Sequence, residues 1–289
     1  MEENKNHPPT AVTETEMLQS LQRSGYLLES AVARQFVDKG FFVETNQVVK
    51  DPFTGKSREI DLQAQNGHYD EESGRLGVYV NIHFTCEIKN NLYPTVLLTP
   101  YFFTPFGDER GGLKQGQTGS GFQEELDIDK FPDLFSIYSS YPSARVYTQY
   151  CSFTRKDKGK ELMAEHPEAL YAGLSKITQC CEEFVEYWNN YPLKDQEDAD
   201  RVHRNLLYLP VVILKDDLYE LNVNGADEHV FTKVPYSRLL FSYHYKEVPQ
   251  SAMVYFVSQP GLDSFIDNML KAETLAKAFM IAGLNSRPR

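Results

Sequence analysis

The sequence predicts an α/β protein with a mixed central β-sheet flanked by helices. Two segments, 58–65 and 78–89, alternate apolar and polar residues with the two-residue period of a strand. Two others, at about 17–39 and 261–283, carry apolar residues at helical spacing. The expected order is helix, three strands, helix, strand, further strands and a final helix, with no internal repeat. This mixture of element types is the basis for the α/β assignment.

The N-terminal region combines a polar tail with the first helix. Residues 1–15 are polar and are expected to be disordered. The helix is expected at about 17–39, with a break near the sequence RSG and a stop at Gly40. Its apolar stripe consists of Leu28, Ala31, Val32 and Phe36.

Three strands are expected after this helix. The first is 41–49, and the turn formers of 50–57 join it as a hairpin to the second strand at 58–65. A polar loop then leads to 78–89, the longest alternating segment of the chain. One face of this third strand is apolar, and the other carries Tyr79, Asn81, His83, Thr85, Glu87 and Lys89.

The composition changes after the third strand. Residues 92–106 are rich in aromatic residues and proline, whereas 107–121 are rich in glycine and are read as a flexible loop or a flap over a substrate. We expect 92–143 to be an insertion within a single domain that covers 16–289. The aromatic side chains suit core packing, an interface, or stacking on nucleobases.

The remaining segments complete the α/β pattern. A strand is expected at 144–153, a helix at 167–189, and buried strands at 208–215 and 251–258. The final helix, at 261–283, has an inward-facing set of Leu262, Phe265, Ile266, Met269 and Leu270.

Composition bears on compartment and partners. The chain has no run of about 18 apolar residues, and its N-terminus lacks the apolar segment of a secretory signal. Its four cysteines form no C-x2-C pair and suit a reducing compartment, so a cytoplasmic protein without membrane partners is expected. The net charge of −12 disfavours a surface built wholly for nucleic acid. Recognition would need a basic patch, metal ions, or a second subunit in a homodimer or another complex.

The polar faces of the second and third strands carry a candidate catalytic site. Asp61 lies on the polar face of the second strand, and Glu87 and Lys89 lie on the polar face of the third. If the two strands pair as a meander, these faces coincide and the carboxylates converge. Carboxylate oxygens hold Mg²⁺, and a bound metal activates water for phosphodiester hydrolysis. Glu59 is interpreted more simply, as a solvated residue on the polar face of the second strand and not as part of the site.

The first helix supplies another carboxylate. Glu29 is the only charged residue in SGYLLESAVA, residues 24–33. A carboxylate at the margin of an apolar stripe is costly unless it is paired, hydrogen-bonded or bound to metal. We therefore expect Glu29 to face Asp61.

This order of elements and acids resembles the PD-(D/E)xK, or restriction-endonuclease-like, nucleases. Glu29 resembles the helical acid of that family, and Asp61 in EID with Glu87 and Lys89 in CEIK resembles its D…E-x-K triad. The hairpin before Asp61 is also similar to that of many members. Ile60 stands where the family pattern has proline, a departure that many members share.

The resemblance covers roughly residues 24–91 and implies a restriction-endonuclease-like core. It implies Mg²⁺- or Mn²⁺-dependent cleavage of DNA, less often of RNA. Asp61 and Glu87 would be metal ligands, Glu29 an accessory ligand, and Lys89 the catalytic base or electrostatic partner. Two alternatives stay open: a catalytically silent binding or scaffold protein with the same fold, and an RNA nuclease.

Two further features are ambiguous. The segment CSFTRKDKGK, residues 151–160, gathers basic residues that suit either phosphate contacts or a solvated loop: Arg155, Lys156, Lys158 and Lys160. His83 shares the polar face of Glu87 and is read as a hydrogen-bonded structural residue in preference to an assistant in the cleft.

Overall fold

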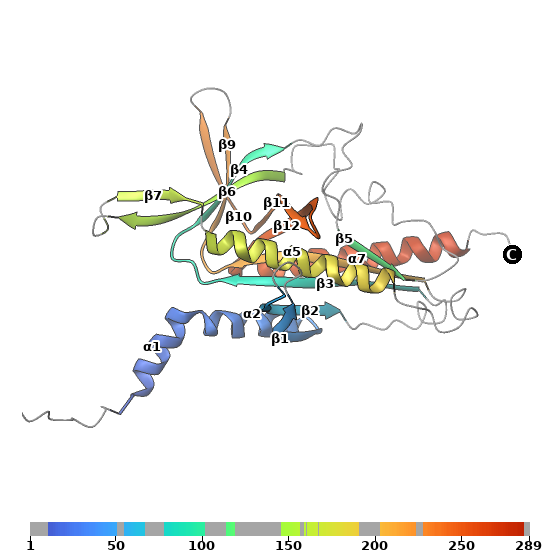
Figure 1. The fold of residues 1–289 in the computed structure, drawn as a ribbon, viewed down its shortest axis with the longest axis horizontal. Coiled ribbons are helices and arrows are strands. Elements are labelled where there is room, and N and C mark those ends of the chain that lie inside the picture. The colour runs from blue at the N-terminus through green and yellow to red at the C-terminus, as the bar shows by residue number, and fades with distance from the viewer. Residues whose placement is uncertain are drawn as a thin grey trace, which may run out of the picture.

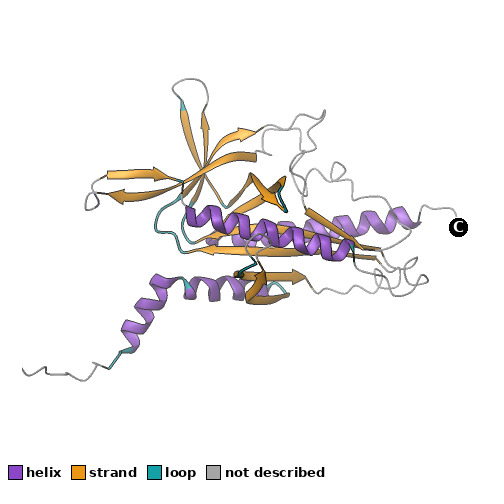
Figure 2. Ribbon diagram, in the orientation of Figure 1, coloured by secondary structure: helices purple, strands orange, loops and turns teal. Residues whose placement is uncertain are grey.

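The computed structural model describes residues 11–50, 55–66, 78–101, 114–118, 146–156, 159, 161–166, 168–190, 203–223 and 228–285. Its strands form one twelve-stranded sheet with helices packed against it, as Figure 1 and Figure 2 show. This confirms the predicted α/β class with a mixed sheet. None of the described helices combines the length and apolar composition that crossing a membrane requires.

The elements that carry the candidate site lie in the first third of the chain and in one later helix. They are α1 (Glu14–Ser24), α2 (Tyr26–Asp38), β1 (Phe41–Lys50), β2 (Ser57–Asn66), β3 (Val78–Lys89) and α5 (Glu168–Asn189). The other elements complete the sheet and cover it. They are β4 (Thr95–Tyr101), β5 (Lys114–Thr118), β6 (Val146–Lys156), β7 (Glu161–Glu165), β8 (His203–Leu214), β9 (Leu218–Val223), β10 (His229–Val234), β11 (Tyr236–Tyr245), β12 (Val248–Ser258), η3 (Gln259–Gly261) and α7 (Leu262–Asn285).

The predicted first helix is two helices, and the predicted break is confirmed. Gly25 separates α1 from α2 with a φ of 95°, a backbone conformation that glycine adopts readily. The expected tail ends earlier than predicted, because Thr13 and Glu16 form a capping box that starts α1 at Glu14. Residues 1–10 lie outside the described residues.

The sheet is a mixed one whose first strands form the predicted meander. Its main path runs β1-β2-β3-β8-β12-β11-β6-β4-β9-β10, with β1, β2 and β3 antiparallel in turn. β8 then pairs with β3 in parallel over the whole of β3, and β12 pairs in parallel with β8. A parallel pair needs a crossover connection, and α5 lies in the stretch of chain that makes it.

The two faces of β3 are covered by different helices. Its apolar face packs against α2 and α7 through an aromatic group that joins Phe84 to Phe36, Phe41 and Phe265. Its polar face lies under α5, which crosses β3 in the view of Figure 1. The predicted alternation of β3 is thus present, and it places Glu87 on the α5 side.

The expected insertion takes part in the sheet. β4 pairs with β6 and β9, and β5 pairs with β8. Residues 102–113 and 119–145 lie outside the described residues, and most of the glycine-rich stretch 107–121 lies there with them.

Candidate active site

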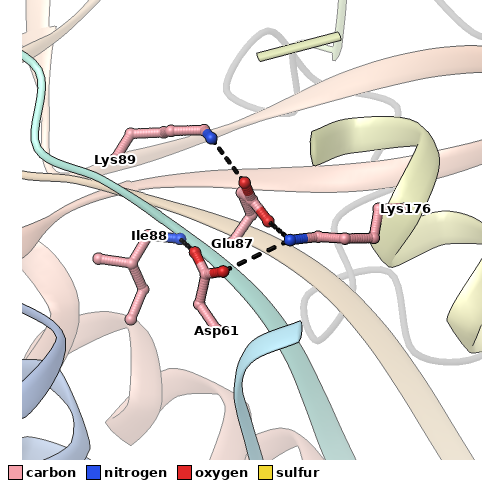
Figure 3. A network of polar contacts seen from close by, with 5 residues as sticks. All are labelled: Asp61, Glu87, Ile88, Lys89 and Lys176. Atoms are coloured by element: carbon pink, nitrogen blue, oxygen red, sulfur yellow. Dashed lines mark hydrogen bonds and ion pairs between the residues drawn. The ribbon is translucent and has the colours of Figure 1, made fainter. Parts of the chain in front are cut away.

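The pairing of β2 with β3 brings two carboxylates together. The register pairs Leu62 with Cys86, so Asp61 and Glu87 are the next positions along the two antiparallel strands. Their side chains converge below α5, where Figure 3 shows them sharing the ammonium of Lys176. The expectation that the two polar faces coincide is confirmed.

Asp61 is held by the backbone of the neighbouring strand. Its Oδ2 accepts a hydrogen bond of 2.7 Å from the backbone N–H of Ile88, and its Oδ1 lies 3.4 Å from Nζ of Lys176. The side chain is 22% exposed. Burial raises the pKa of Asp61, and the neighbouring Glu87 raises it further, while Lys176 acts in the opposite direction.

Glu87 is enclosed more completely than Asp61. Its side chain is 6% exposed, and its Oε1 lies 2.5 Å from Nζ of Lys89. Oε2 forms an ion pair with Lys176. From above, Gly173 of α5 lies so close that a Cβ at that position would come within 2.8 Å of Cγ, Cδ and Oε1 of Glu87. Only a residue without a side chain lets the helix approach this carboxylate.

Lys176 was not among the residues predicted from the sequence. It is the only basic residue of α5, it is 13% exposed, and its ammonium lies between the two carboxylates. The available signal was its position three residues after Gly173, next to the buried Ile177. That spacing places it on the face of α5 that packs against the sheet.

Glu29 lies in the first turn of α2 and is half-buried. Burial raises its pKa, and the charges of Asp61 and Glu87 raise it further. This electrostatic effect requires Glu29 to lie near the other two carboxylates. The structure therefore brings all four predicted residues of the site into one region and adds Lys176 to them.

A divalent cation fits this donor set only if Lys176 moves. Within the described residues, no cluster of three or more His, Cys, Asp or Glu side chains is arranged to hold a metal. Mg²⁺, however, is commonly held by one or two carboxylates together with waters and substrate phosphate. Asp61 and Glu87 supply such a pair, and the ammonium between them already occupies a position that suits a cation.

The two described basic residues predicted to contact phosphate are engaged in another part of the fold. Arg155 donates to the backbone oxygen of Gly159, and Lys156 pairs with Glu165 at 3.5 Å, so both are engaged within the β6–β7 hairpin. Lys158 lies outside the described residues. Glu59 is exposed, as its solvated reading requires.

His83 lies on the same face of β3 as Glu87 but is not hydrogen-bonded through Nε2. That atom is buried and makes no hydrogen bond within the described part of the chain, so the reading of His83 as a hydrogen-bonded residue is not supported at Nε2. The imidazole lies beside the ring of Tyr208, at a centroid distance of 4.9 Å.

Comparisons of the chain with known protein families, with curated proteins and with solved structures found no match. The site itself is therefore the basis for a functional proposal.

Proposed function

We propose that this protein is a metal-dependent nuclease that hydrolyses phosphodiester bonds, in DNA in preference to RNA. The observation that carries the proposal is the convergence of Asp61 and Glu87 from paired strands, with Lys89 in contact with Glu87. The resemblance of this arrangement to the D…E-x-K triad of restriction-endonuclease-like proteins supports it, as does the nearby carboxylate of Glu29.

The residues have distinct roles in this proposal. Asp61 and Glu87 would hold Mg²⁺ or Mn²⁺, with Glu29 as an accessory ligand. The ion, when bound, lowers the pKa of a coordinated water and offsets charge on the phosphate. Lys89 orients the attacking water or stabilises the charge that develops on the phosphate oxygens. Gly173 and α5 exclude water from the buried side of Glu87.

Lys176 makes metal binding an exchange of cations. Its ammonium neutralises both carboxylates without metal, and it must leave them when a divalent ion binds. The displaced ammonium would then be free to contact the substrate phosphate. Removal of the Lys176 charge should therefore increase metal affinity.

A second candidate function is a silent nuclease-fold protein that binds a partner without turnover. The ion pairs of Lys176 favour it, since they complete the cluster without metal. The net charge of −12 also favours it, because phosphate-binding surfaces are usually basic.

The deciding experiment combines Mn²⁺ calorimetry with cleavage assays on single-stranded DNA, duplex DNA and RNA. We expect the natural chain to bind Mn²⁺ and to cut DNA, and Asp61→Asn to lose both properties. Lys89→Ala should reduce cleavage by about a hundredfold or more while the metal still binds.

The matched control is Glu59→Gln, which removes an exposed carboxylate from the same strand two residues before Asp61. It should bind Mn²⁺ and cleave as the natural chain does. A natural chain that binds no Mn²⁺ and cuts no polymer would instead support the silent binding protein, and cleavage of RNA alone would support the RNA nuclease.

A further inference from the structure

A cavity of about 420 Å³ lies on the same side of the sheet as the Asp61–Glu87 cluster. It is bordered by β1, β2 and β3 and by the C-terminal half of α5. His83 and Thr85 line it, and strand alternation places both on the face of β3 that also carries Glu87. His83 is four residues from Glu87, which corresponds to about 13 Å along the strand.

The cavity has aromatic walls. Phe184 of α5 and Tyr208 of β8 stack with their planes 9° apart and their centroids 5.5 Å apart. Trp188 and Tyr187 extend this wall along α5. Phe42 and Tyr187 are each 56% exposed, so the cavity opens to solvent between β1 and the end of α5.

Amide groups from the two hairpin strands provide hydrogen-bonding capacity in the cavity. Gln47, Gln63 and Gln65 all line it, and each amide can both donate and accept. Oε1 of Gln47 and Nε2 of His83 are buried without a hydrogen-bond partner in the described structure. Burial lowers the pKa of His83 to about 4, so the imidazole is neutral at pH 7.

Charge restricts what this cavity can hold. Glu44 and Glu183 line it, and among its described lining residues there is no Lys or Arg. A phosphate group would be repelled, whereas a neutral planar ring with a polar edge finds both stacking surfaces and hydrogen-bonding groups. The volume lies within the range of about 300–1,000 Å³ that is typical of ligand pockets.

We propose that this cavity binds an unstacked nucleobase from a single-stranded part of the nucleic-acid substrate. The ring packs against the aromatic wall, its polar edge meets the glutamine amides, and the phosphates stay outside. Aromatic stacking and hydrogen bonding to the base edge are the usual means by which proteins hold an unstacked base. The proposal rests on the proposed nuclease function for the origin of the base, and it assigns a single-stranded substrate to that function.

The only tryptophan of the chain reports on the cavity directly, because Trp188 lines it. We would titrate the full-length protein in EDTA, where no metal-dependent cleavage occurs, with a ten-nucleotide single strand of DNA, its duplex, and free deoxyadenosine. The single strand should quench Trp188 fluorescence saturably. The duplex and the nucleoside should each bind at least about tenfold more weakly. The duplex offers no unpaired base, and the nucleoside has no sugar-phosphate backbone.

Two variants probe the aromatic wall. Phe184→Leu keeps an apolar side chain and removes the stacking ring, and should weaken binding of the single strand about fivefold or more. Tyr187→Ala changes an exposed side chain, and keeps the test valid if Phe184→Leu does not fold. The control is Phe231→Ala, which removes an exposed ring from β10 and should leave binding unchanged.

The outcomes separate this proposal from the nuclease function. Pocket-dependent binding of the single strand in a protein that never cleaves with Mn²⁺ would support the cavity and overturn the nuclease. Cleavage with no Trp188 response and no effect of the two variants would overturn the cavity alone. Equal binding of the duplex and the single strand would also overturn the cavity proposal, as would a nucleoside that binds as tightly as the strand.

Discussion

At Asp61, a carboxylate is held where its charge is poorly solvated. Burial and the adjacent Glu87 both raise its pKa, and the pKa of Glu29 is raised for the same two kinds of reason. An acid whose pKa is higher in the folded state favours folding when it is protonated. That contribution is complete below the pKa of the unfolded chain and is lost as the pH rises through the higher folded value.

The raised pKa of Asp61 predicts how an isosteric substitution at this position changes stability. Asp61→Asn retains an oxygen that can accept from the Ile88 N–H, and it removes the buried charge. At pH 7 we expect the variant to unfold at a temperature at least about 2 °C above that of the natural chain. The difference should shrink as the pH falls toward 4. Thermal denaturation between pH 4 and pH 8 measures it, and a lower unfolding temperature at pH 7 would contradict the prediction.

Residues of the site differ in how far the sequence reveals them. Asp61, Glu87 and Lys89 could be proposed because strand alternation places them on the polar faces of two consecutive strands, and Glu29 because it was the lone charge on an apolar stripe. Lys176 could not, since its contact with Asp61 depends on how α5 packs across the sheet. Local periodicity indicates which face of α5 carries Lys176, but not which strands that face crosses.

At the scale of elements, the position of α5 fixes the geometry over the acids. Tyr243 of β11 donates a 2.6 Å hydrogen bond to the buried Glu182, and Gln179 donates to the backbone oxygen of His244. One turn further along, Tyr245 donates to Glu186 at 2.9 Å. These contacts restrict rotation of the helix and so hold Gly173 over Glu87.

Gly173→Ala tests this close approach. Alanine favours a helix over glycine by about 1 kcal/mol in isolation, so a substitution that only strengthened the helix would stabilise the protein. Here the added Cβ would lie 2.8 Å from Glu87, and we expect lower stability and weaker Mn²⁺ binding. Urea denaturation and calorimetry provide the two measurements.

A double-mutant cycle locates the cause. If the clash is with Glu87, then Gly173→Ala should cost less in a Glu87→Ala background than in the natural chain. Equal costs in the two backgrounds would mean that Glu87 is not the group that is displaced.

The elements with the clearest sequence periods were predicted most closely. The segment 78–89 is β3 residue for residue, and α5 begins one residue after its predicted start. β4 was predicted to be part of an insertion because 92–106 are rich in aromatic residues and proline, Pro100 among them. Its pairing with β6 and β9, and the positive φ of 57° at Thr99, are not indicated by any local pattern. β11 was also missed, and its partners, β12 and β6, are set by tertiary pairing.

At the scale of the whole molecule, negative charge predominates while the candidate site holds two lysines. With a net charge of −12, the chain has little general attraction for a polyanion. Lys89 and Lys176 are the cations at the site, and both are paired with its carboxylates. Binding of nucleic acid should therefore release few counterions.

The salt dependence of binding follows from the number of lysines at the site. For a single strand, the slope of log K against log salt is about −0.7 for each phosphate neutralised, so two lysines give at most a slope of about −1.4. In EDTA both lysines stay paired with the carboxylates, and the slope should be shallower still. Fluorescence titration of the single strand in EDTA at several salt concentrations measures it. A slope steeper than about −4 would contradict the prediction and place the phosphate contacts on a basic surface elsewhere.

The class of the fold was predictable, and the order of the strands was not. Helical and strand periods identified an α/β chain, and a hairpin followed by an alternating strand suggested the meander. The parallel pairs β3–β8 and β8–β12 join segments that are distant in sequence. Nothing in the local pattern of either segment specifies its partner.

The long parallel pairing of β3 with β8 also has a consequence for how the protein folds. Val78–Lys89 lie in the first third of the chain, and His203–Leu214 lie in the last third. Pairing between distant segments must overcome a large loop-closure entropy, so it forms slowly. A nascent chain that has emerged from the ribosome only as far as α5 contains Asp61, Glu87 and Lys176 but no β8. We therefore expect the acidic cluster to reach its final arrangement only after β8 has emerged and paired with β3.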